Sequence, residues 1–277
     1  MTAVGHGTLY VVSTPIGHMG DFSFRAVETL RSVAAVLAED TRHSVHLLKR
    51  YDVATPLIAH HEHNEAKSTP ALVARLLGGD SLALISDAGT PLLSDPGSRL
   101  VRAAVDAGVT VSPVPGASAL LAGLVASGLD IDRFTFFGFL PRKGGSRRDA
   151  IADLVSSRYA VVLYEAPPRV AETLRDIVNA GGGMRGAAVA RELTKQFEET
   201  RRGTVADLAA YYSDAPPRGE IVIVIAGADV PAGASENELR ERAAVLRAEG
   251  LSAREVAAVL TNELGATRNV AYRLAHE

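Results

Sequence analysis

The chain has 277 residues, a net charge of −3, 47% hydrophobic and 22% charged residues, which suits one large or two ordinary domains and excludes a mostly disordered chain. The slightly acidic balance argues against a protein that coats nucleic acid, although it leaves room for a local basic patch. The absence of cysteine excludes a disulfide scaffold, a zinc finger, an iron–sulfur site and a cysteine nucleophile.

The first half of the chain alternates short apolar runs with segments of helical spacing. This rhythm predicts an α/β fold built on a mostly parallel sheet. Helices are expected at 24–36 and 117–126, and two more from the Pro-containing starts at 68–70 and 95–96. Strands are expected at 9–13, 35–38, 57–59, 81–86 and 109–114.

The apolar rhythm breaks at 127–132, which predicts a linker to a second α/β domain. In that domain, strands are expected at 134–138, 160–164, 187–190 and 220–225, and helices at 148–156, 170–179 and 205–212. The tail after 235 contains only helical patterns. We therefore expect an N-terminal α/β domain at 1–126, a second α/β domain at 127–230 and a helical appendage at 231–277.

No leader or membrane segment is expected, because the start lacks a charged region before an apolar stretch and the apolar runs are far shorter than about 20 residues. A cytoplasmic protein is the expectation. Residues 181–186 match the dinucleotide pattern G-x-G-x-x-G, but they follow a helix and precede a strand, which favours a plain loop. The cluster of His60, His61 and His63 has no zinc spacing, so no metal is expected.

The sharpest candidate site is the loop 86–97 (SDAGTPLLSDPG), at the carboxyl end of a buried strand, where open α/β sheets bind ligands. Asp87 can accept hydrogen bonds from a ligand amine, Gly89 permits close backbone approach, and Pro91 stiffens the loop. A breaker-rich turn is the alternative. The loops 13–17 and 114–119 also follow strands, so all three predict one extended cleft.

A basic segment, 141–148 (PRKGGSRR), carries four positive charges in eight residues. It is either a phosphate-contacting loop or a solvated one. The RNA-binding candidates are Arg142, Lys143, Arg147, Arg148 and, more weakly, Arg191.

Nine motifs in order resemble one family. They are LYVVSTPIG at 9–17, EDTR at 39–42, HEHNE at 61–65, SDAGTPLLSDPG at 86–97, VPGASA at 114–119, GFLPRK at 138–143, YEAPPR at 164–169, ARELTK at 190–195 and RGE at 218–220. Together they are similar to the ribosomal RNA small subunit methyltransferase I family, within the tetrapyrrole-methylase-like, class III S-adenosylmethionine-dependent enzymes. Arg218 stands where a Lys is more familiar, and 196–198 replaces a His-Glu-like ending.

The resemblance implies two α/β domains with S-adenosylmethionine in the cleft between them, generally as a homodimer. The implied reaction is 2′-O-methylation of a cytidine in the decoding centre of 16S rRNA, within the small ribosomal subunit. The implied cofactor contacts are Pro15, Ile16, Asp87, Ala88, Gly89, Thr90, Pro91, Ser118, Ala119, Leu163, Tyr164, Ala190, Gly219, Glu220 and Ile221.

Methyl transfer to a ribose hydroxyl needs in-line positioning and removal of the hydroxyl proton. Four scattered lysines argue against a Lys-Asp-Lys-Glu set. The candidate bases are carboxylates at the cleft edge, and our hypothesis is that Asp40 and Arg42 act together near the target ribose. Each carboxylate has a structural ion pair or a helix cap as its alternative role. The candidates are Glu39, Asp40, Glu62 and Glu165.

Two other functions stay open from the sequence. A methyltransferase acting on a tetrapyrrole precursor would not need the basic loop or the helical tail. A non-catalytic RNA-binding or ribosome-assembly protein would not need the loop 86–97 together with Pro15 and Ser118.

Overall fold

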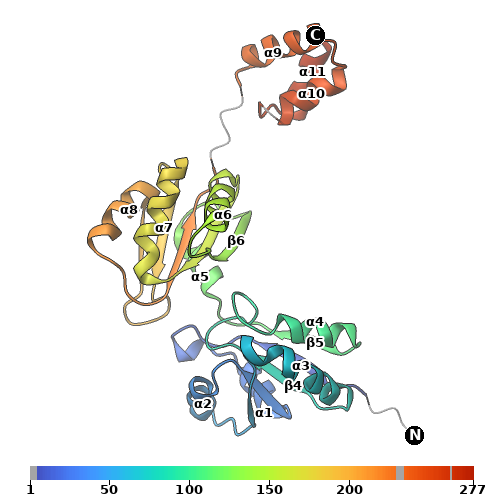
Figure 1. Cartoon of the computed structure of the whole chain (residues 1–277), viewed down its shortest axis with the longest axis vertical. Coiled ribbons are helices and arrows are strands. Elements are labelled where there is room, and N and C mark those ends of the chain that lie inside the picture. Colours follow the sequence, from blue (N-terminus) through green and yellow to red (C-terminus); the bar gives the residue numbers. More distant parts are fainter. Residues whose placement is uncertain (1–4, 229–233, 263) are drawn as a thin grey trace.

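The computed structural model describes residues 5–228, 234–262 and 264–277. Figure 1 shows two α/β units that follow one another along the chain, and then a group of C-terminal helices. Each unit contains one five-stranded sheet, so the predicted fold class, two α/β domains with a helical C-terminal part, is confirmed. In the described ranges we find no helix with the length and apolar character needed to cross a bilayer.

The first sheet is entirely parallel, in the order β3-β2-β4-β1-β5. Its central strands β2 and β4 are buried along their whole length, which explains their continuous apolar sequences. Because all five strands run the same way, their carboxyl ends share one edge of the sheet. The strands are β1 (Thr8–Val12), β2 (Ala35–Ala38), β3 (Leu57–Ala59), β4 (Leu82–Ile85) and β5 (Thr110–Val114).

Helices cover both faces of the first sheet. Ala26 and Leu30 of α1 (Phe24–Ser32) and Leu48 of α2 (Thr41–Arg50) pack into one hydrophobic cluster. The other face is covered by α3 (Glu62–Leu77) and α4 (Ser98–Asp106), through leucines of both helices. A short 3₁₀ helix, η1 (Met19–Asp21), precedes α1.

Helix α3 begins earlier than the Pro-containing start at 68–70 predicts, and Pro70 lies inside it. The start is set at His61, whose amide donates to Oδ1 of Asn64 at 2.9 Å and whose carbonyl accepts from the Asn64 amide at 3.0 Å. The hydroxyl of Thr69 donates to the Glu65 carbonyl at 2.8 Å, one turn earlier. Polar capping at 61–64 therefore decides the boundary, and the expected start at 68 was wrong. Helix α4 likewise begins at Ser98, after Gly97, rather than at 95–96.

The second sheet is mixed, in the order β6-β7-β10-β8-β9. Only β6 and β7 are parallel, and β10 runs antiparallel to both of its neighbours. The start of β10 consequently lies beside the end of β7. The strands are β6 (Phe134–Phe139), β7 (Ala160–Glu165), β8 (Gly186–Arg191), β9 (Glu199–Thr204) and β10 (Ile221–Ile225).

Helices also cover both faces of the second sheet. Three helices contribute to its larger cluster: α6 (Gly145–Ser156), α7 (Val170–Ile177) and α8 (Val205–Asp214). The opposite face is covered by α5 (Ala119–Ser127), whose Leu120 and Leu124 pack with residues of β7, β8 and β10. Two short elements, η2 (Pro167–Arg169) and the π-helical turn η3 (Val178–Gly182), flank α7. Residues 181–186 are indeed a connection from helix to strand.

Helix α5 packs closely on the second sheet although it follows directly from β5 of the first. A Cβ on Gly123 would lie 2.6 Å from Cγ1 of Val222, so only glycine permits this approach. By packing, α5 belongs with the second sheet, whereas the sequence places it before the division at 126/127. That division, and the one at 230/231, stay predictions.

The three helices expected in the tail are present: α9 (Glu236–Ala248), α10 (Ala253–Asn262) and α11 (Arg268–His276). They bury their own apolar cluster, which includes Leu239, Val256 and Leu274. Ser252 accepts from the amide of Glu255 and begins α10, as its sequence position predicts. The appendage thus has a core of its own.

Candidate functional site

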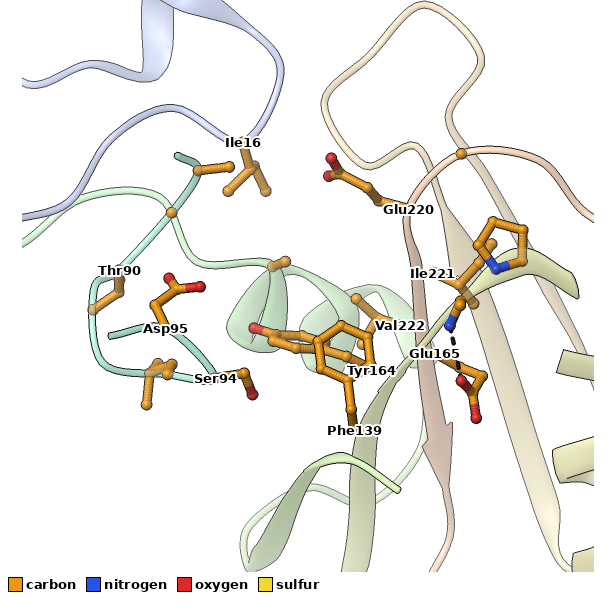
Figure 2. A pocket seen from close by; sticks show the side chains of 17 residues that line it. Ile16, Thr90, Ser94, Asp95, Phe139, Tyr164, Glu165, Glu220, Ile221 and Val222 are labelled. Carbon is orange, nitrogen blue, oxygen red and sulfur yellow. Dashed lines mark hydrogen bonds between the residues drawn. The ribbon is translucent and has the colours of Figure 1, made fainter. Parts of the chain in front are cut away.

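A cavity of about 380 Å³ lies between the two sheets. One wall consists of the loops that follow β1, β4 and β5, and the other comes from the ends of β6 and β7 and the start of β10 (Figure 2). Its volume falls in the range of small-molecule and cofactor sites. It is lined by Ile16, Ala88, Gly89, Thr90, Leu93, Ser94, Asp95, Ala119, Phe139, Tyr164, Glu165, Ala166, Pro167, Gly219, Glu220, Ile221 and Val222.

The three loops that the sequence assigns to one cleft are bonded together. Thr14 and Gly89 form an isolated β-bridge, with N···O distances of 2.9 and 3.1 Å. The hydroxyl of Thr90 lies 3.0 Å from that of Ser13 and donates to the carbonyl of Ala117 at 3.1 Å. One loop from each of β1, β4 and β5 is therefore held in a single arrangement at the sheet edge.

The loop 86–97 contains two residues with a strained backbone. Leu92 and Ser94 have φ values of 74° and 73°, a left-handed conformation that non-glycine residues rarely adopt. Such residues cost of the order of 1 kcal/mol or more each and persist where the surroundings hold them. This strain accompanies the turn that brings Leu93, Ser94 and Asp95 to the cavity wall.

Asp95 brings a negative charge to the cavity wall (Figure 2). Burial raises the pKa of its carboxyl, the Ser86 hydroxyl opposes this by hydrogen bonding, and the charge of Asp87 raises it further. In the described part of the chain no salt bridge neutralises Asp95. A half-buried carboxylate without a cation favours a positively charged ligand. Asp95 was not predicted as a site residue, although it lies in the loop 86–97.

The second-sheet wall is aromatic. The ring of Tyr164 packs against Phe136 and Phe139, with centroid distances of 5.0 and 5.6 Å. Its hydroxyl accepts from the amide of Leu120 at 3.1 Å, and burial raises the pKa of the phenol. The phenol is therefore neutral at physiological pH and keeps its proton for donation.

The cavity rim at 219–222 depends on the close approach of the Gly219 backbone to the Glu192 side chain. Gly219 has a φ of +87°, and a Cβ there would lie 2.2 Å from Oε1 of Glu192. That carboxylate accepts from the amide of Glu220 at 3.1 Å and from the ammonium of Lys195 at 3.0 Å. Lys195 also pairs with Glu220 at 3.3 Å, so it holds this rim together.

The loop 192–195 also touches the first unit. The amide of His18 donates to Oγ1 of Thr194 at 3.0 Å, and a Cβ on Gly17 would lie 2.5 Å from Cγ of Lys195. Glu192 and Thr194 have φ values of 50° and 65°. The two units thus meet beside the cavity through strained backbone and a glycine.

The fifteen predicted cofactor contacts divide between this cavity and other places. Nine line it: Ile16, Ala88, Gly89, Thr90, Ala119, Tyr164, Gly219, Glu220 and Ile221. Pro15 and Asp87 line a smaller neighbouring cavity instead. Pro91, Ser118, Leu163 and Ala190 are not among the lining residues. Residues that the sequence analysis did not select are Leu93, Ser94, Asp95, Phe139, Ala166, Pro167 and Val222.

Glu165 lines the cavity, but its carboxylate is fully committed elsewhere. The side chain is 0% exposed, accepts from the Thr173 hydroxyl at 2.6 Å and the Ala166 amide at 2.9 Å, and pairs with Arg169 at 3.4 Å. In Figure 2 the carboxylate is turned toward Ala166. These partners lie within the second unit and hold the carboxylate in place, so the geometry favours a structural role for Glu165, and its role as a base stays a prediction.

Asp40 and Arg42 are paired, as the sequence hypothesis requires. The Asp40 carboxylate caps α2 by accepting from the Arg42 amide, and it forms two bonds with the guanidinium, at 2.7 and 3.1 Å. These bonds hold the pKa of Asp40 far below its usual range. Asp40 is therefore a weak base, and neither residue lines the cavity.

Glu39 is in the opposite electrostatic situation. Partial burial raises the pKa of its carboxyl, and the charges of Asp95, Asp87, Asp40 and Glu62 raise it further. A carboxylate of raised pKa is a better base. Glu62 itself is exposed in the first turn of α3, a favourable place for a carboxylate.

The basic segment is partly structural. The Arg147 side chain is 7% exposed and donates to Asp176, Thr173 and the carbonyl of Pro141. Arg191 pairs with Glu199 at 2.8 Å. Arg147 is thus unavailable to phosphate and instead anchors the segment, which corrects its RNA-binding assignment. Arg142, Lys143 and Arg148 are exposed.

Comparisons with known proteins identify the family. The profile of the tetrapyrrole (corrin/porphyrin) methylases matches residues 8–209. A relative from Synechocystis sp. is 44% identical over 274 residues, 98% of both chains, and one from Xylella fastidiosa is 47% identical over 96% of this chain and 98% of its own. Both are named ribosomal RNA small subunit methyltransferase I. This chain belongs to the ribosomal RNA small subunit methyltransferase I family.

Solved structures agree with the fold of this family. A uroporphyrin-III-C-methyltransferase from Thermus thermophilus covers 79% of this chain and 94% of its own, with a TM-score of 0.56 and 19% identity. A cobalt precorrin-4 methyltransferase gives a TM-score of 0.58 at 16% identity, covering 79% of this chain and 94% of its own. At such identities the likeness shows the fold alone. Membership of the ribosomal RNA small subunit methyltransferase I family confirms the predicted class, a methyltransferase dependent on S-adenosylmethionine.

Proposed function

We propose that this enzyme methylates the ribose 2′-oxygen of a cytidine in the decoding centre of 16S rRNA, within the small ribosomal subunit. The observation that carries the proposal is the 44–47% identity, over nearly whole chains, to relatives named ribosomal RNA small subunit methyltransferase I. The cleft between the sheets and the exposed cations of the basic segment support the same function.

The cavity between the sheets fits S-adenosylmethionine by its chemistry. Asp95 supplies a negative charge for a ligand that carries a sulfonium and an ammonium. Ile16, Leu93 and Val222 supply apolar contact for an adenine ring, and the Tyr164 hydroxyl supplies a donor. When bound, S-adenosylmethionine supplies a methyl group whose bond to sulfur breaks, the electron pair staying on sulfur, as a bond to the acceptor oxygen forms.

Glu39 is our proposed general base for the ribose hydroxyl. It follows β2 at the sheet edge that carries the ligand loops, and it lies close enough to Asp95 and Asp87 for their charges to raise its pKa. Glu39 would take the hydroxyl proton as the oxygen becomes bonded to the methyl carbon. Asp40 and Arg42 would position the target ribose rather than deprotonate its hydroxyl, because their pairing keeps Asp40 a weak base.

Arg142, Lys143 and Arg148 are our proposed contacts to the RNA backbone. The segment follows β6, whose last residue, Phe139, lines the cavity. Arg147 fixes the base of the segment by donating to the Pro141 carbonyl at 3.1 Å, and Arg169 donates to the Leu140 carbonyl at 3.2 Å. Exposed cations on an anchored loop suit phosphate contacts that set orientation without reading sequence.

We also propose a cytoplasmic homodimer. Leu121 and Val125 lie one turn apart on α5 with exposed fractions of 53% and 74%. Leucine and valine side chains on one exposed helix face offer apolar area for a symmetric contact. Sedimentation of the full chain tests the proposal: a dimer is expected, and Leu121→Glu with Val125→Glu is expected to yield monomer. A monomeric wild-type chain would contradict it.

The main proposal is tested by methyl transfer to small subunits from a strain that lacks this enzyme. With a tritiated methyl donor, label is expected in 16S rRNA at a cytidine 2′-oxygen, located by nuclease digestion and mass spectrometry. A parallel reaction offers a tetrapyrrole precursor. Label in the tetrapyrrole, or none in either reaction, would overturn the proposal.

A further inference from the structure

An open groove of about 650 Å³ is formed by helices α10 and α11 of the C-terminal appendage (Figure 1). We call it the α10–α11 groove. The methyl transfer proposed above uses none of its residues. The groove is lined by Arg254, Ala257, Ala258 and Thr261 of α10 and by Arg268, Asn269 and Tyr272 of α11.

The lining residues form one stripe on each helix. Arg254, Ala258 and Thr261 lie three or four residues apart along α10, a spacing that places side chains on the same helix face. Arg268 and Tyr272 have the same relation on α11. Both arginines and the tyrosine are exposed and take no part in the apolar cluster of the appendage. Their side chains are therefore available to a ligand.

The appendage as a whole is not basic. Residues 234–277 contain six arginines and seven glutamates. Two of these arginines and two of the glutamates neutralise one another in a network of ion pairs between the ends of α9 and α11, formed by Arg240, Arg273, Glu236 and Glu277. Any positive field on the appendage is consequently local.

The α10–α11 groove is where such a local field arises. Arg254 and Arg268 have no ion-pair partner in the part of the chain that the structure describes, and no carboxylate is among the lining residues. A guanidinium keeps its charge at every physiological pH, and its planar fork matches the oxygens of a phosphate. Two uncompensated guanidiniums along one groove therefore favour a polyanion.

Tyr272 adds an exposed aromatic ring to the groove. The residue is 64% exposed, and its ring packs edge-on against His276 at a centroid distance of 4.4 Å, which restricts its orientation. Exposed rings of this kind stack unpaired bases of single-stranded RNA. The small side chains of Ala257 and Ala258 leave room for a base. A duplex, whose bases are already stacked on one another, cannot use the ring in this way.

We propose that the α10–α11 groove binds a single-stranded segment of the RNA substrate, with phosphates against Arg254 and Arg268 and one base stacked on Tyr272. This inference rests on the proposed function and adds an RNA contact apart from the basic segment 141–148. An acidic protein surface would also be attracted by the two charges, but it has no base to stack on the exposed ring.

The test compares the double variant Arg254→Ala with Arg268→Ala, and the single variant Tyr272→Ala, with Arg242→Ala as a matched control. Arg242 is an exposed arginine of α9 in the same appendage, and it does not line the groove. The full chain is titrated against a fluorescently labelled single-stranded RNA of mixed sequence, and against the same RNA annealed to its complement, at several salt concentrations. All the changed side chains are exposed, so folding is expected to survive.

For the double variant we expect the Kd for single-stranded RNA to rise about tenfold or more, and the slope of log Kd against log salt to fall by about 1.4, or about 0.7 for each lost phosphate contact. Tyr272→Ala is expected to raise the Kd about fivefold or more for the single strand and to leave the duplex unaffected. Tyr272→Phe, which keeps the ring, and Arg242→Ala are expected to bind the single strand like wild type.

The same variants are then assayed for methyl transfer to small subunits. The double variant is expected to raise KM for small subunits, whereas kcat and the affinity for S-adenosylmethionine stay those of wild type. A purely structural role of the arginines would instead lower the fraction of folded enzyme and so reduce the apparent kcat.

Three results would overturn the inference. One is a double variant whose Kd and salt slope equal those of Arg242→Ala. Another is a Tyr272→Ala variant that loses affinity equally for single strand and duplex. The third is a loss confined to small subunits, with none for protein-free RNA, which would assign the groove to a ribosomal protein. The RNA titration involves no methyl transfer, so failure of wild type to methylate small subunits would count against the proposed function alone.

Discussion

The two walls of the cofactor cavity differ in how their charges are compensated. On the first-sheet side, Asp95 lines the cavity and Glu39 lies near it without lining it; both are partly buried carboxylates of raised pKa without a salt bridge in the described ranges. On the second-sheet side, Glu165 is paired with Arg169 and Glu192 with Lys195. An uncompensated carboxylate is available to a ligand or a proton, whereas a paired one holds the chain in place. We infer that carboxylates of the first unit take part in ligand binding and proton transfer, whereas those of the second unit hold its backbone in place.

The largest expected effect that would sharpen this contrast is on catalysis. Glu39→Gln keeps the shape of the side chain and removes the proposed base, so kcat is expected to fall about 10²–10⁴-fold. Affinity for S-adenosylmethionine, measured by calorimetry, is expected to stay within a few-fold. A variant with near wild-type kcat would show that another group is the base, and would contradict the proposed difference between the two walls.

The matching experiment changes Glu165 on the second-sheet wall. Glu165→Gln breaks a buried ion pair and leaves Arg169 without its anion, which is expected to lower the free energy of unfolding by about 3–5 kcal/mol. Activity per folded molecule is expected to remain, since the carboxylate makes only internal bonds. Denaturant titration and kinetics at low temperature measure both quantities. Loss of kcat without loss of stability would give Glu165 a catalytic role after all.

A smaller effect is expected at Asp95, where a substitution tests ligand binding separately from proton transfer on the first-sheet wall. Asp95→Asn preserves size and removes the charge that faces the cavity, so affinity for the cationic cofactor is expected to fall about tenfold or more. Affinity for uncharged adenosine, measured in the same titration, is expected to change little. Equal losses for both ligands would show that Asp95 shapes the wall rather than providing charge.

The smallest expected effect is the pH dependence of stability. Because the pKa of Glu39 is raised from 4.5 by burial and by Asp95, Asp87, Asp40 and Glu62, the folded state holds this proton more tightly than the unfolded state. Stability associated with Glu39 is thus lost as pH rises from 4.5 through the raised value.

The Tm of Glu39→Gln relative to wild type is expected to be higher at pH 8 than at pH 4. The gain is no more than about 2–4 °C, because solvent screens a partly exposed carboxyl. A difference in Tm that is the same at both pH values would show that Glu39 does not titrate in this way.

Sequence patterns predicted the first sheet well, because its strands are continuous apolar runs between breakers. Helix α2 was missed because its sequence, TRHSVHLLKR, is mostly polar and Asp40 was interpreted as a site residue rather than as a helix cap. Strand β9 was missed because it is an edge strand with the charged sequence ETRRGT. Both elements lack the apolar periodicity on which such predictions depend.

The sequence patterns predicted which loops form the site, but they predicted the single residues that line it less well. Side chains alternate along a strand, so when Tyr164 faces the cavity its neighbour Leu163 faces the opposite cluster. Arg147 was separable from Arg148 in principle, because Arg147, Ile151 and Leu154 share one buried helix face. Charge density alone predicted a basic segment, and because the helix was predicted to begin at 148, after Arg147, helical spacing was not applied to this residue.

The Thr14–Gly89 bridge has a thermodynamic consequence. It couples the loop after β1 to the loop after β4, and residues of both loops line the cofactor cavity, so a ligand bound there orders both loops together. Ligand binding is then expected to stabilise the bridge, and linkage requires that the bridge favours ligand binding by the same factor. The bridge thereby makes the order of these two loops and the affinity for the cofactor interdependent.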